Sequence, residues 1–167
     1  MTSLPAVSGQ SASGLPVLGP GAEKFLTFRV GGQLFGIPAL AIQDIIGPQP
    51  IAKIPMAPSF VAGALNLRGR IVTAIDMHNA LGLKPTDQAK KLNVVVRSGL
   101  ELYDLLVDDV GDVLSFSMGD LEPNPVSWPE AWRTFSAGIF KLDGELLVVL
   151  NFDVLLSTHT KLIDKAA

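Results

Sequence analysis

The sequence predicts an all-β protein made of two tandem barrels, each of roughly five strands and about 60 residues. Two observations indicate this fold class. Short apolar runs with strand periodicity follow one another along the chain, separated by turns that contain glycine. The same order of runs and turns also occurs twice, which indicates an internal duplication. Helices are expected to be short and few.

The composition restricts the classes of protein to which the chain can belong. Of its 167 residues, 48% are apolar and 17% are charged, and the mean hydropathy is +0.39, so part of the apolar surface must form a large core or face a partner. No stretch approaches the roughly 18 consecutive apolar residues of a spanning helix, which argues against direct membrane insertion. A net charge of −3 provides no field that would attract nucleic acid. The absence of cysteine excludes disulfides and thiol chemistry, and two distant histidines argue against a metal site.

The first segment differs in composition from the rest of the chain. Residues 1–21 include eleven Pro, Gly or Ser residues and no charged residue, so residues 1–23 are predicted to form a flexible arm. The first basic residue is Lys24, which leaves the N-terminus without the basic start of a secretory signal. A cytoplasmic protein is therefore expected.

The folded part is predicted to begin with a hairpin. Leu26, Phe28 and Val30 alternate with polar residues, and Gly31-Gly32 then precedes a second apolar run. Two runs joined by Gly-Gly are typical of a tight hairpin, because both turn residues can adopt positive φ. Further strands are expected over residues 62–67, 70–75, 92–97, 101–108, 137–142 and 145–150.

The second half of the chain repeats the first. A strand, a glycine turn, an apolar strand and a short apolar helix around Gly63 and Gly69 recur 75 positions later, around Gly138 and Gly144. Residues 42–46 recur 68 positions later, and the two hairpin turns are 67 positions apart. The duplication assigns a first barrel to about residues 24–83 and a second to about 90–157, with exchange of strands at the ends allowed, and leaves 158–167 as a C-terminal tail. Barrels of this size are marginal alone, so the seam between them is expected to be apolar.

No arrangement of residues in the sequence indicates catalysis. The patterns of a phosphate-binding loop, a zinc-binding helix and a nucleophile elbow are missing. Asp76 is expected to cap a short helix rather than to form a catalytic pair with His78, because residues two apart on a helix point to different faces. One acidic set lacks the spacing of a calcium loop and is interpreted as solvated strand ends: Asp104, Asp108, Asp109 and Asp112.

Two further features allow a structural and a functional interpretation. Ser127 and Glu130 match a capping box, which predicts a short helix with Trp128 and Trp132 on one face, either in the core or as an anchor for a partner. Arg68 lies at the tip of a predicted hairpin, either as an ordinary solvated turn residue or as a guanidinium offered to a partner's carboxylate or helix C-terminus. The residues alone leave both interpretations of Arg68 open.

Four ordered segments give a resemblance to a known family. Residues 63–76, with the sequence GALNLRGRIVTAID, resemble the hallmark segment of the chemotaxis coupling protein family CheW, and residues 25–37, 42–47 and 105–114 resemble its other segments. The resemblance covers about Phe25 to Leu156. It implies two SH3-like five-stranded β-barrel subdomains and a non-enzymatic adaptor without a cofactor. Such an adaptor couples the cytoplasmic tips of chemoreceptors to the regulatory domain of the histidine kinase CheA, within membrane-associated receptor arrays.

The resemblance also implies the binding residues. In the family, a helical hairpin of the receptor docks in a groove between the subdomains, and the matching positions here are Ile42, Asp44, Ile45, Gly63, Arg68 and Val113. The candidate kinase contacts are Leu121, Glu122, Val126 and Trp128. The family usually has Glu at the position of Asp44, and the sequence EPNP at 122–125 replaces its familiar basic or polar residues.

Two alternative functions remain open from the sequence. One is a coupling-like module of a non-motility signalling array, and the other is a small-ligand-binding or enzymatic β-barrel. An adaptor needs exposed apolar grooves, whereas a ligand-binding or enzymatic barrel needs a concave pocket with converging polar groups.

Overall fold

The computed structural model describes residues 21–85 and 91–166, with side chains as far as His159. Most of the predicted arm lies outside these residues. The first strand already begins at Ala22, so the last two residues assigned to the arm belong to the folded part.

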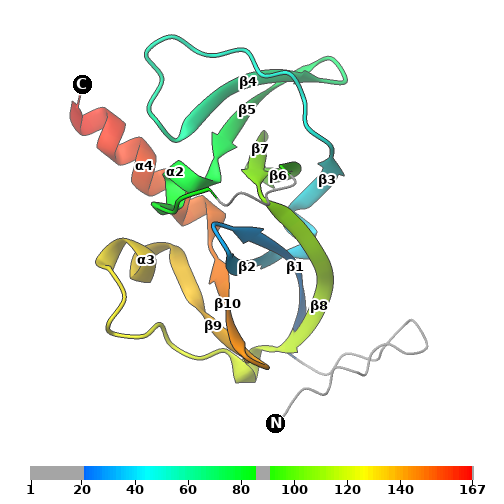
Figure 1. Ribbon diagram of the computed structural model, residues 1–167, viewed down its shortest axis with the longest axis vertical. Coiled ribbons are helices and arrows are strands. Elements are labelled where there is room, and N and C mark those ends of the chain that lie inside the picture. The colour runs from blue at the N-terminus through cyan, green and yellow to red at the C-terminus, as the bar shows by residue number, and fades with distance from the viewer. Residues whose placement is uncertain (1–20, 86–90, 167) are drawn as a thin grey trace.

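The described residues form two five-stranded sheets, which curl into two barrels stacked along the long axis of the molecule (Figure 1). We call them barrel A, with the strand order β8-β1-β2-β10-β9, and barrel B, with the order β3-β6-β7-β5-β4. The strands of barrel A are β1 Ala22–Val30, β2 Gln33–Pro38, β8 Asp109–Ser117, β9 Ser136–Leu142 and β10 Glu145–Leu150. Those of barrel B are β3 Ile42–Ile46, β4 Val61–Leu67, β5 Arg70–Asp76, β6 Leu92–Ser98 and β7 Glu101–Val107. The helices are η1 Ala39–Ala41, α2 Met77–Leu81, η2 Met118–Asp120, α3 Glu130–Phe135 and α4 Phe152–Ala166.

The two repeats exchange strands between the barrels. The first repeat comprises β1 to β5 and the second β6 to β10, and each barrel combines the first hairpin of one repeat with the last three strands of the other. A parallel pair completes each sheet, β2 with β10 in barrel A and β5 with β7 in barrel B. The expected division into residues 24–83 and 90–157 describes the two repeats, and the exchange of strands that it allowed at the ends involves the whole first hairpin of each repeat.

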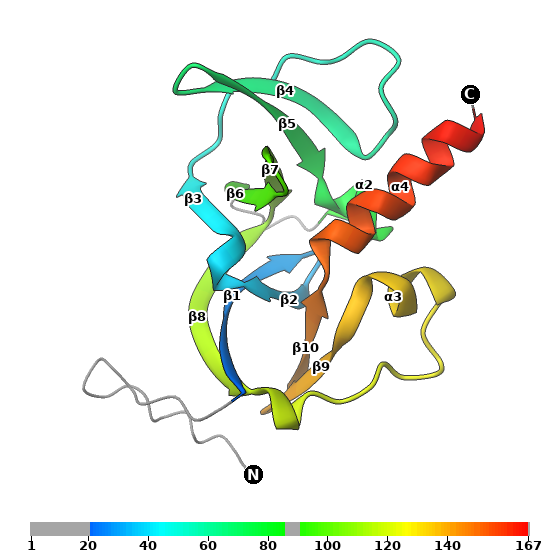
Figure 2. The same ribbon diagram turned by 180° about the vertical axis from the view of Figure 1, so that it is seen from behind.

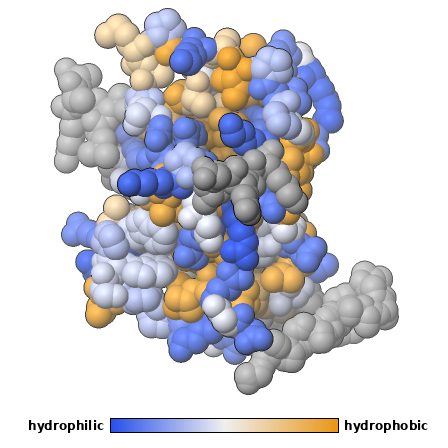
Figure 3. All heavy atoms as spheres, viewed as in Figure 1, coloured by the Kyte–Doolittle hydropathy of each residue, from blue (hydrophilic) through white to orange (hydrophobic). Residues whose placement is uncertain are grey.

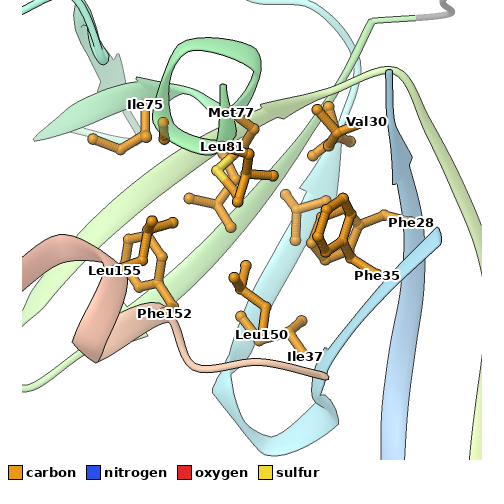
Figure 4. Close-up of a cluster of buried hydrophobic side chains, with 14 of the residues drawn as sticks. Phe28, Val30, Phe35, Ile37, Ile75, Met77, Leu81, Leu150, Phe152 and Leu155 are labelled. Carbon is orange, nitrogen blue, oxygen red and sulfur yellow. The ribbon is translucent and has the colours of Figure 1, made fainter. Parts of the chain in front are cut away.

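A shared apolar seam joins the two barrels, as the sequence predicts. Phe28 and Phe35 of the first hairpin stack at a centroid distance of 5.9 Å within this seam (Figure 4). Met77 of α2 and Leu155 of α4 are buried in the same cluster. Smaller apolar clusters fill the interior of barrel A and of barrel B. Because the central cluster takes side chains from both barrels, we expect the chain to unfold as one cooperative unit.

Two local predictions are confirmed. Gly31 and Gly32 have φ of 58° and 84°, as the tight turn between β1 and β2 requires. The Asp76 carboxylate accepts hydrogen bonds from the backbone N–H groups of the second and third residues after it, so it caps α2. At the equivalent place in the second repeat, Asn151 Oδ1 accepts from Val154 N at 3.1 Å at the start of α4.

Two helix predictions differ from the structure. α3 begins only at Glu130, and no side chain caps it, so the predicted capping box of Ser127 with Glu130 is wrong. Trp128 lies before the helix, because the residue preceding a proline is disfavoured in helical geometry. α4 continues to Ala166, so the predicted tail from residue 158 onwards is helical over most of its length.

Candidate functional site

The tip of the β4–β5 hairpin carries an exposed arginine in a demanding backbone conformation. Arg68 and Gly69 form the two-residue turn with φ of 51° and 83°. A positive φ is costly for an arginine, and Asn66 supports the turn by accepting a hydrogen bond from Gly69 N at 2.8 Å. The turn holds the Arg68 side chain 76% exposed at the edge of barrel B.

Arg68 is held by a carboxylate of the neighbouring edge strand. Its Nη2 donates to Asp44 Oδ2 at 2.9 Å. The other carboxylate oxygen of Asp44 accepts from the backbone N–H of Ile45 at 2.8 Å, which fixes the orientation of the carboxylate. A guanidinium has five N–H donors in a planar fork, so one bond to Asp44 leaves most of the fork for a second carboxylate.

Exposed aliphatic side chains accompany this ion pair. Ile45 on β3 is 42% exposed and Val113 on β8 is 52% exposed. The two residues are equivalents in the repeat, 68 positions apart, and their strands are edge strands of barrel B and barrel A. β3 and β8 lie along the same side of the molecule in both views (Figures 1 and 2). Ile42 is half-buried and packs against the central seam instead.

Gly63 allows two backbone segments of the site to approach each other closely. It is buried, its φ is 150°, and a Cβ built on it would lie 2.3 Å from the carbonyl oxygen of Ala52. Ala52 pairs with Ala64, the residue after Gly63, in the short bridge that ties the β3–β4 connection to β4. Of the predicted receptor-binding residues, the structure thus brings Asp44, Ile45 and Arg68 together and gives Gly63 a supporting role.

Barrel B also exposes apolar residues outside the predicted receptor-binding set. Ile54, Met56 and Ile71 are exposed on the β3–β4 connection and on β5. Apolar side chains are visible among the polar ones on the upper part of the molecule in Figure 3, where Figure 1 places barrel B. Ile71 lies in a strand with alternating polar and apolar residues. Such alternation does not distinguish a residue that faces solvent from one that faces a partner.

The predicted kinase-binding residues fall into two environments. Leu121 packs against the interior cluster of barrel A, and Glu122 pairs with Lys141 at 3.3 Å. Val126 is 91% exposed, whereas Trp128 packs against the central seam and meets Trp132 edge to face. These four residues do not form one continuous patch of side chains.

A cavity of about 510 Å³ near the start of α2 bears on the ligand-binding alternative. It is lined in part by Asp76, His78 and Asp108. His78 Nε2 lies 2.8 Å from Asp108 Oδ1, and Asp108 Oδ2 accepts from Gly31 N at 2.7 Å. Asp76 therefore caps α2 and Asp108 holds the β1–β2 turn, whereas His78 Nε2 and Asp108 Oδ1 are close but make no hydrogen bond among the described residues. No group of three or more potential ligands among the described residues could hold a metal ion.

The interpretation of the acidic set as solvated strand ends is wrong for two of its members. Asp104 and Asp108 are buried, with 0% and 4% of their surface exposed. Asp109 and Asp112 are at least partly exposed on β8. Polar residues in alternating strands are usually on the solvent side, and only the three-dimensional pairing shows that Asp104 faces inwards.

The sequence matches a known protein family over most of its length. A family model described as CheW-like domain matches residues 24–159. The chain belongs to the CheW-like family. It is 31% identical over 134 residues to the chemotaxis protein CheW of Rhizobium meliloti, which covers 80% of this chain and 86% of that protein. A probable chemotaxis protein CheW of Rhizobium etli is 30% identical over 141 residues, covering 84% and 91% of the two chains.

A solved structure shares the fold of this CheW-like chain. The scaffolding protein TtCheW from Thermoanaerobacter tengcongensis superposes with a TM-score of 0.70 at 27% identity, covering 79% of this chain and 86% of that one. The predicted fold class, two SH3-like barrels of five strands with few helices, is confirmed for the CheW-like domain. Among the helices that the structure describes, none has the length and apolar character needed to cross a membrane.

Proposed function

We propose that this CheW-like protein is a non-enzymatic adaptor that couples the cytoplasmic tips of chemoreceptors to the regulatory domain of the histidine kinase CheA. It acts in the cytoplasm at membrane-associated receptor arrays, and it needs no cofactor. Membership of a family that includes a scaffolding protein supports this role.

The receptor-binding part of the proposal rests on one observation above all. Arg68 is exposed, forms an ion pair with Asp44, and lies near the exposed Ile45. Val113 adds an aliphatic side chain from the pseudo-equivalent strand of barrel A. Apolar anchors supply contact area for the apolar face of a receptor helix, and the guanidinium supplies orientation by binding a carboxylate or a helix C-terminus.

Asp44 acts as a positioning residue in this proposal. By holding Nη2 of Arg68, it reduces the rotamer freedom that the long side chain would otherwise lose on binding. Asp44 is one methylene shorter than glutamate, so the turn at Arg68 must lie close to β3 for the pair to form. Gly63 contributes indirectly, by allowing the β3–β4 connection to approach β4.

The kinase contact is proposed for the segment that includes Leu121, Glu122, Val126 and Trp128. Val126 is the most exposed apolar residue of the four, and it is the first candidate for substitution. The segment lies on barrel A, on the opposite part of the molecule from the Arg68 hairpin, so both partners can bind at the same time (Figure 1).

A binding experiment with two components tests the adaptor proposal. Titration of a receptor signalling-tip fragment and of the CheA regulatory domain should give two independent affinities. Val126→Asp should weaken the kinase affinity and leave the receptor affinity unchanged, whereas Ile45→Asp should do the reverse. Loss of both affinities in either folded variant would contradict the assignment of separate faces.

A further inference from the structure

A carboxylate is buried inside the barrel that carries the Arg68 site. Asp104 on β7 has no exposed surface. Its side chain lies in the interior of barrel B, since its cross-strand neighbours Val95 and Ala74 belong to the apolar cluster there. Oδ2 accepts from Asn93 Nδ2 at 2.5 Å, and Oδ1 has no hydrogen-bond partner among the described residues.

The comparison of the two repeats shows that the fold does not require this polar pair. The β1–β2 and β6–β7 hairpins align at a spacing of 68, so Asn93 and Asp104 correspond to Phe25 and Gly36 of barrel A. Phe25 is part of the apolar interior of barrel A. At the two equivalent positions, barrel A therefore has an apolar ring and a glycine, whereas barrel B has an amide bonded to a carboxylate.

Burial makes proton binding by this carboxyl favourable. Desolvation raises the pKa of Asp104 from 3.8 to about 6, and the hydrogen bond from Asn93 only partly opposes the shift. The folded chain therefore binds this proton more tightly than the unfolded chain does. The resulting stabilisation is fully present below pH 3.8 and is lost as the pH rises through about 6.

The row of residues across barrel B connects Asp104 to the receptor-binding residues. Val95 is paired with Asp104 on one side and with Asp44 on the other. Two strand spacings separate the backbones of Asp44 and Asp104, a distance of roughly 10 Å. Asn93, which holds Asp104, is paired with Ile46 at the end of the same edge strand.

Two charged side chains on elements that contact β7, His78 and Arg29, lie next to other groups. α2, which packs on β7, brings His78, and His78 pairs with Asp108 beyond the end of the strand. From β1, Arg29 pairs with Glu145 on β10. β5 and β6 face Asp104 with Ala74, Val95 and the uncharged Asn93. Asp44, with its partner Arg68, is therefore the charged site in the same row as Asp104.

We propose that Asp104 is a proton-binding site beneath the receptor-binding face, and that it takes up a proton when a partner carboxylate docks on Arg68. This inference rests on the proposed receptor-binding function. Docking places a second negative charge beside Asp44, so the Arg68 guanidinium then pairs with two carboxylates. The additional charge and the exclusion of water make an ionised Asp104 less favourable, so protonation and binding favour each other. Receptor binding then tightens as the pH falls from 7.5 to 5.5.

The test compares the full chain with Asp104→Asn, and uses Asp143→Asn as a matched control on the exposed β9–β10 turn. The midpoint of thermal unfolding and the affinity for a receptor-tip fragment are each measured at pH 7.5 and 5.5. Relative to Asp104→Asn, the wild type should gain about 3 °C in the midpoint on acidification. Its receptor affinity should increase about two- to threefold more than that of Asp104→Asn. Asp143→Asn should follow the wild type in both measurements.

Should Asp104→Asn fold poorly, a direct titration of Asp104 in the wild type tests the proton site. The carboxyl ¹³C resonance of Asp104 in the wild type should titrate near pH 6 in the free protein and at higher pH in the receptor complex. A midpoint near 4, or equal pH dependence of unfolding in the wild type and the variant, would overturn the proton site. A midpoint near 6 that does not move on binding would overturn the coupling. Failure to bind the receptor at either pH would refute the proposed function, while the titration of the free protein would still decide on the proton site.

Discussion

Replacement of Arg68 by alanine separates the functional from the structural interpretation of this residue. The wild-type side chain is 76% exposed and makes one ion pair, with Asp44 at 2.9 Å. An exposed pair of this kind stabilises a fold by at most about 1 kcal/mol. Alanine keeps the left-handed backbone conformation of position 68, so it removes the ion pair and adds no new backbone cost. The free energy of unfolding of Arg68→Ala should therefore decrease by less than about 1 kcal/mol.

The expected effect on receptor binding is larger. Loss of a hydrogen bond to a charged partner group costs about 1–3 kcal/mol, which corresponds to an affinity roughly 5- to 150-fold lower. Calorimetry with a receptor signalling-tip fragment measures the affinity, and urea unfolding measures the stability. Arg70→Ala is the matched control, because Arg70 is exposed beside the same turn. Arg68→Asn is a second variant, since asparagine tolerates positive φ and lacks the cation.

Two outcomes would refute this reasoning. A folded Arg68→Ala that binds the receptor within twofold of the wild type would show that Arg68 is an ordinary solvated turn residue. Equal losses in Arg68→Ala and Arg70→Ala would show that the binding depends on general positive charge and not on the fork held by Asp44. Unfolding of Arg68→Ala, with Arg68→Asn folded, would assign the residue to the turn.

Three further predictions follow from the same geometry. Asp44→Asn removes the charge that positions Arg68 and should weaken receptor binding a few-fold in calorimetry. The double variant Asp44→Asn with Arg68→Ala should bind the receptor no more weakly than Arg68→Ala alone. Additive losses of affinity would contradict a positioning role. Gly63→Ala places a Cβ against the carbonyl of Ala52 and should lower the free energy of unfolding by about 2–4 kcal/mol in urea titration, whereas Gly47→Ala, with open space around it, should be nearly neutral. Removal of residues 1–20 keeps the hydrogen bond from Met118 N to Gly21 O, and should change neither the melting temperature nor the receptor affinity. A melting temperature lower by more than about 5 °C, which corresponds to roughly 1–2 kcal/mol, would show that this segment packs on the barrels.

The features that the sequence predicts well are local ones. The Gly31-Gly32 turn and the Asp76 cap depend on a few adjacent residues, and both are present as expected. The recurrence at spacings of 68 and 75 is also evidence from short strings of sequence, although the second hairpin turn is Gly99-Leu100 and lies 68 rather than the predicted 67 positions after Gly31-Gly32. The hydrogen bond from Asp76 N to Phe60 O recurs as one from Asn151 N to Phe135 O, again 75 positions later.

The features that the sequence did not predict depend on contacts between distant segments. The periodicity of β1 and β2 is the same whether they pair with β5 or with β10, so the sequence allows an exchange of strands between the repeats but does not show that whole hairpins exchange. Asp104 and Asp108 have the polar character of strand ends, and their burial follows only from the closure of the barrel and of the link to the β1–β2 turn. In the candidate site, the Arg68–Asp44 pair joins residues 24 positions apart on different strands.

A combined binding measurement tests the adaptor role most directly. The chain, a receptor signalling-tip fragment and the CheA regulatory domain are mixed and analysed by sedimentation velocity, in pairs and all together. A ternary complex is predicted, with Arg68→Ala losing the receptor and retaining the kinase domain. Mutually exclusive binding of the two partners, or binding of neither by the folded chain, would contradict the adaptor role.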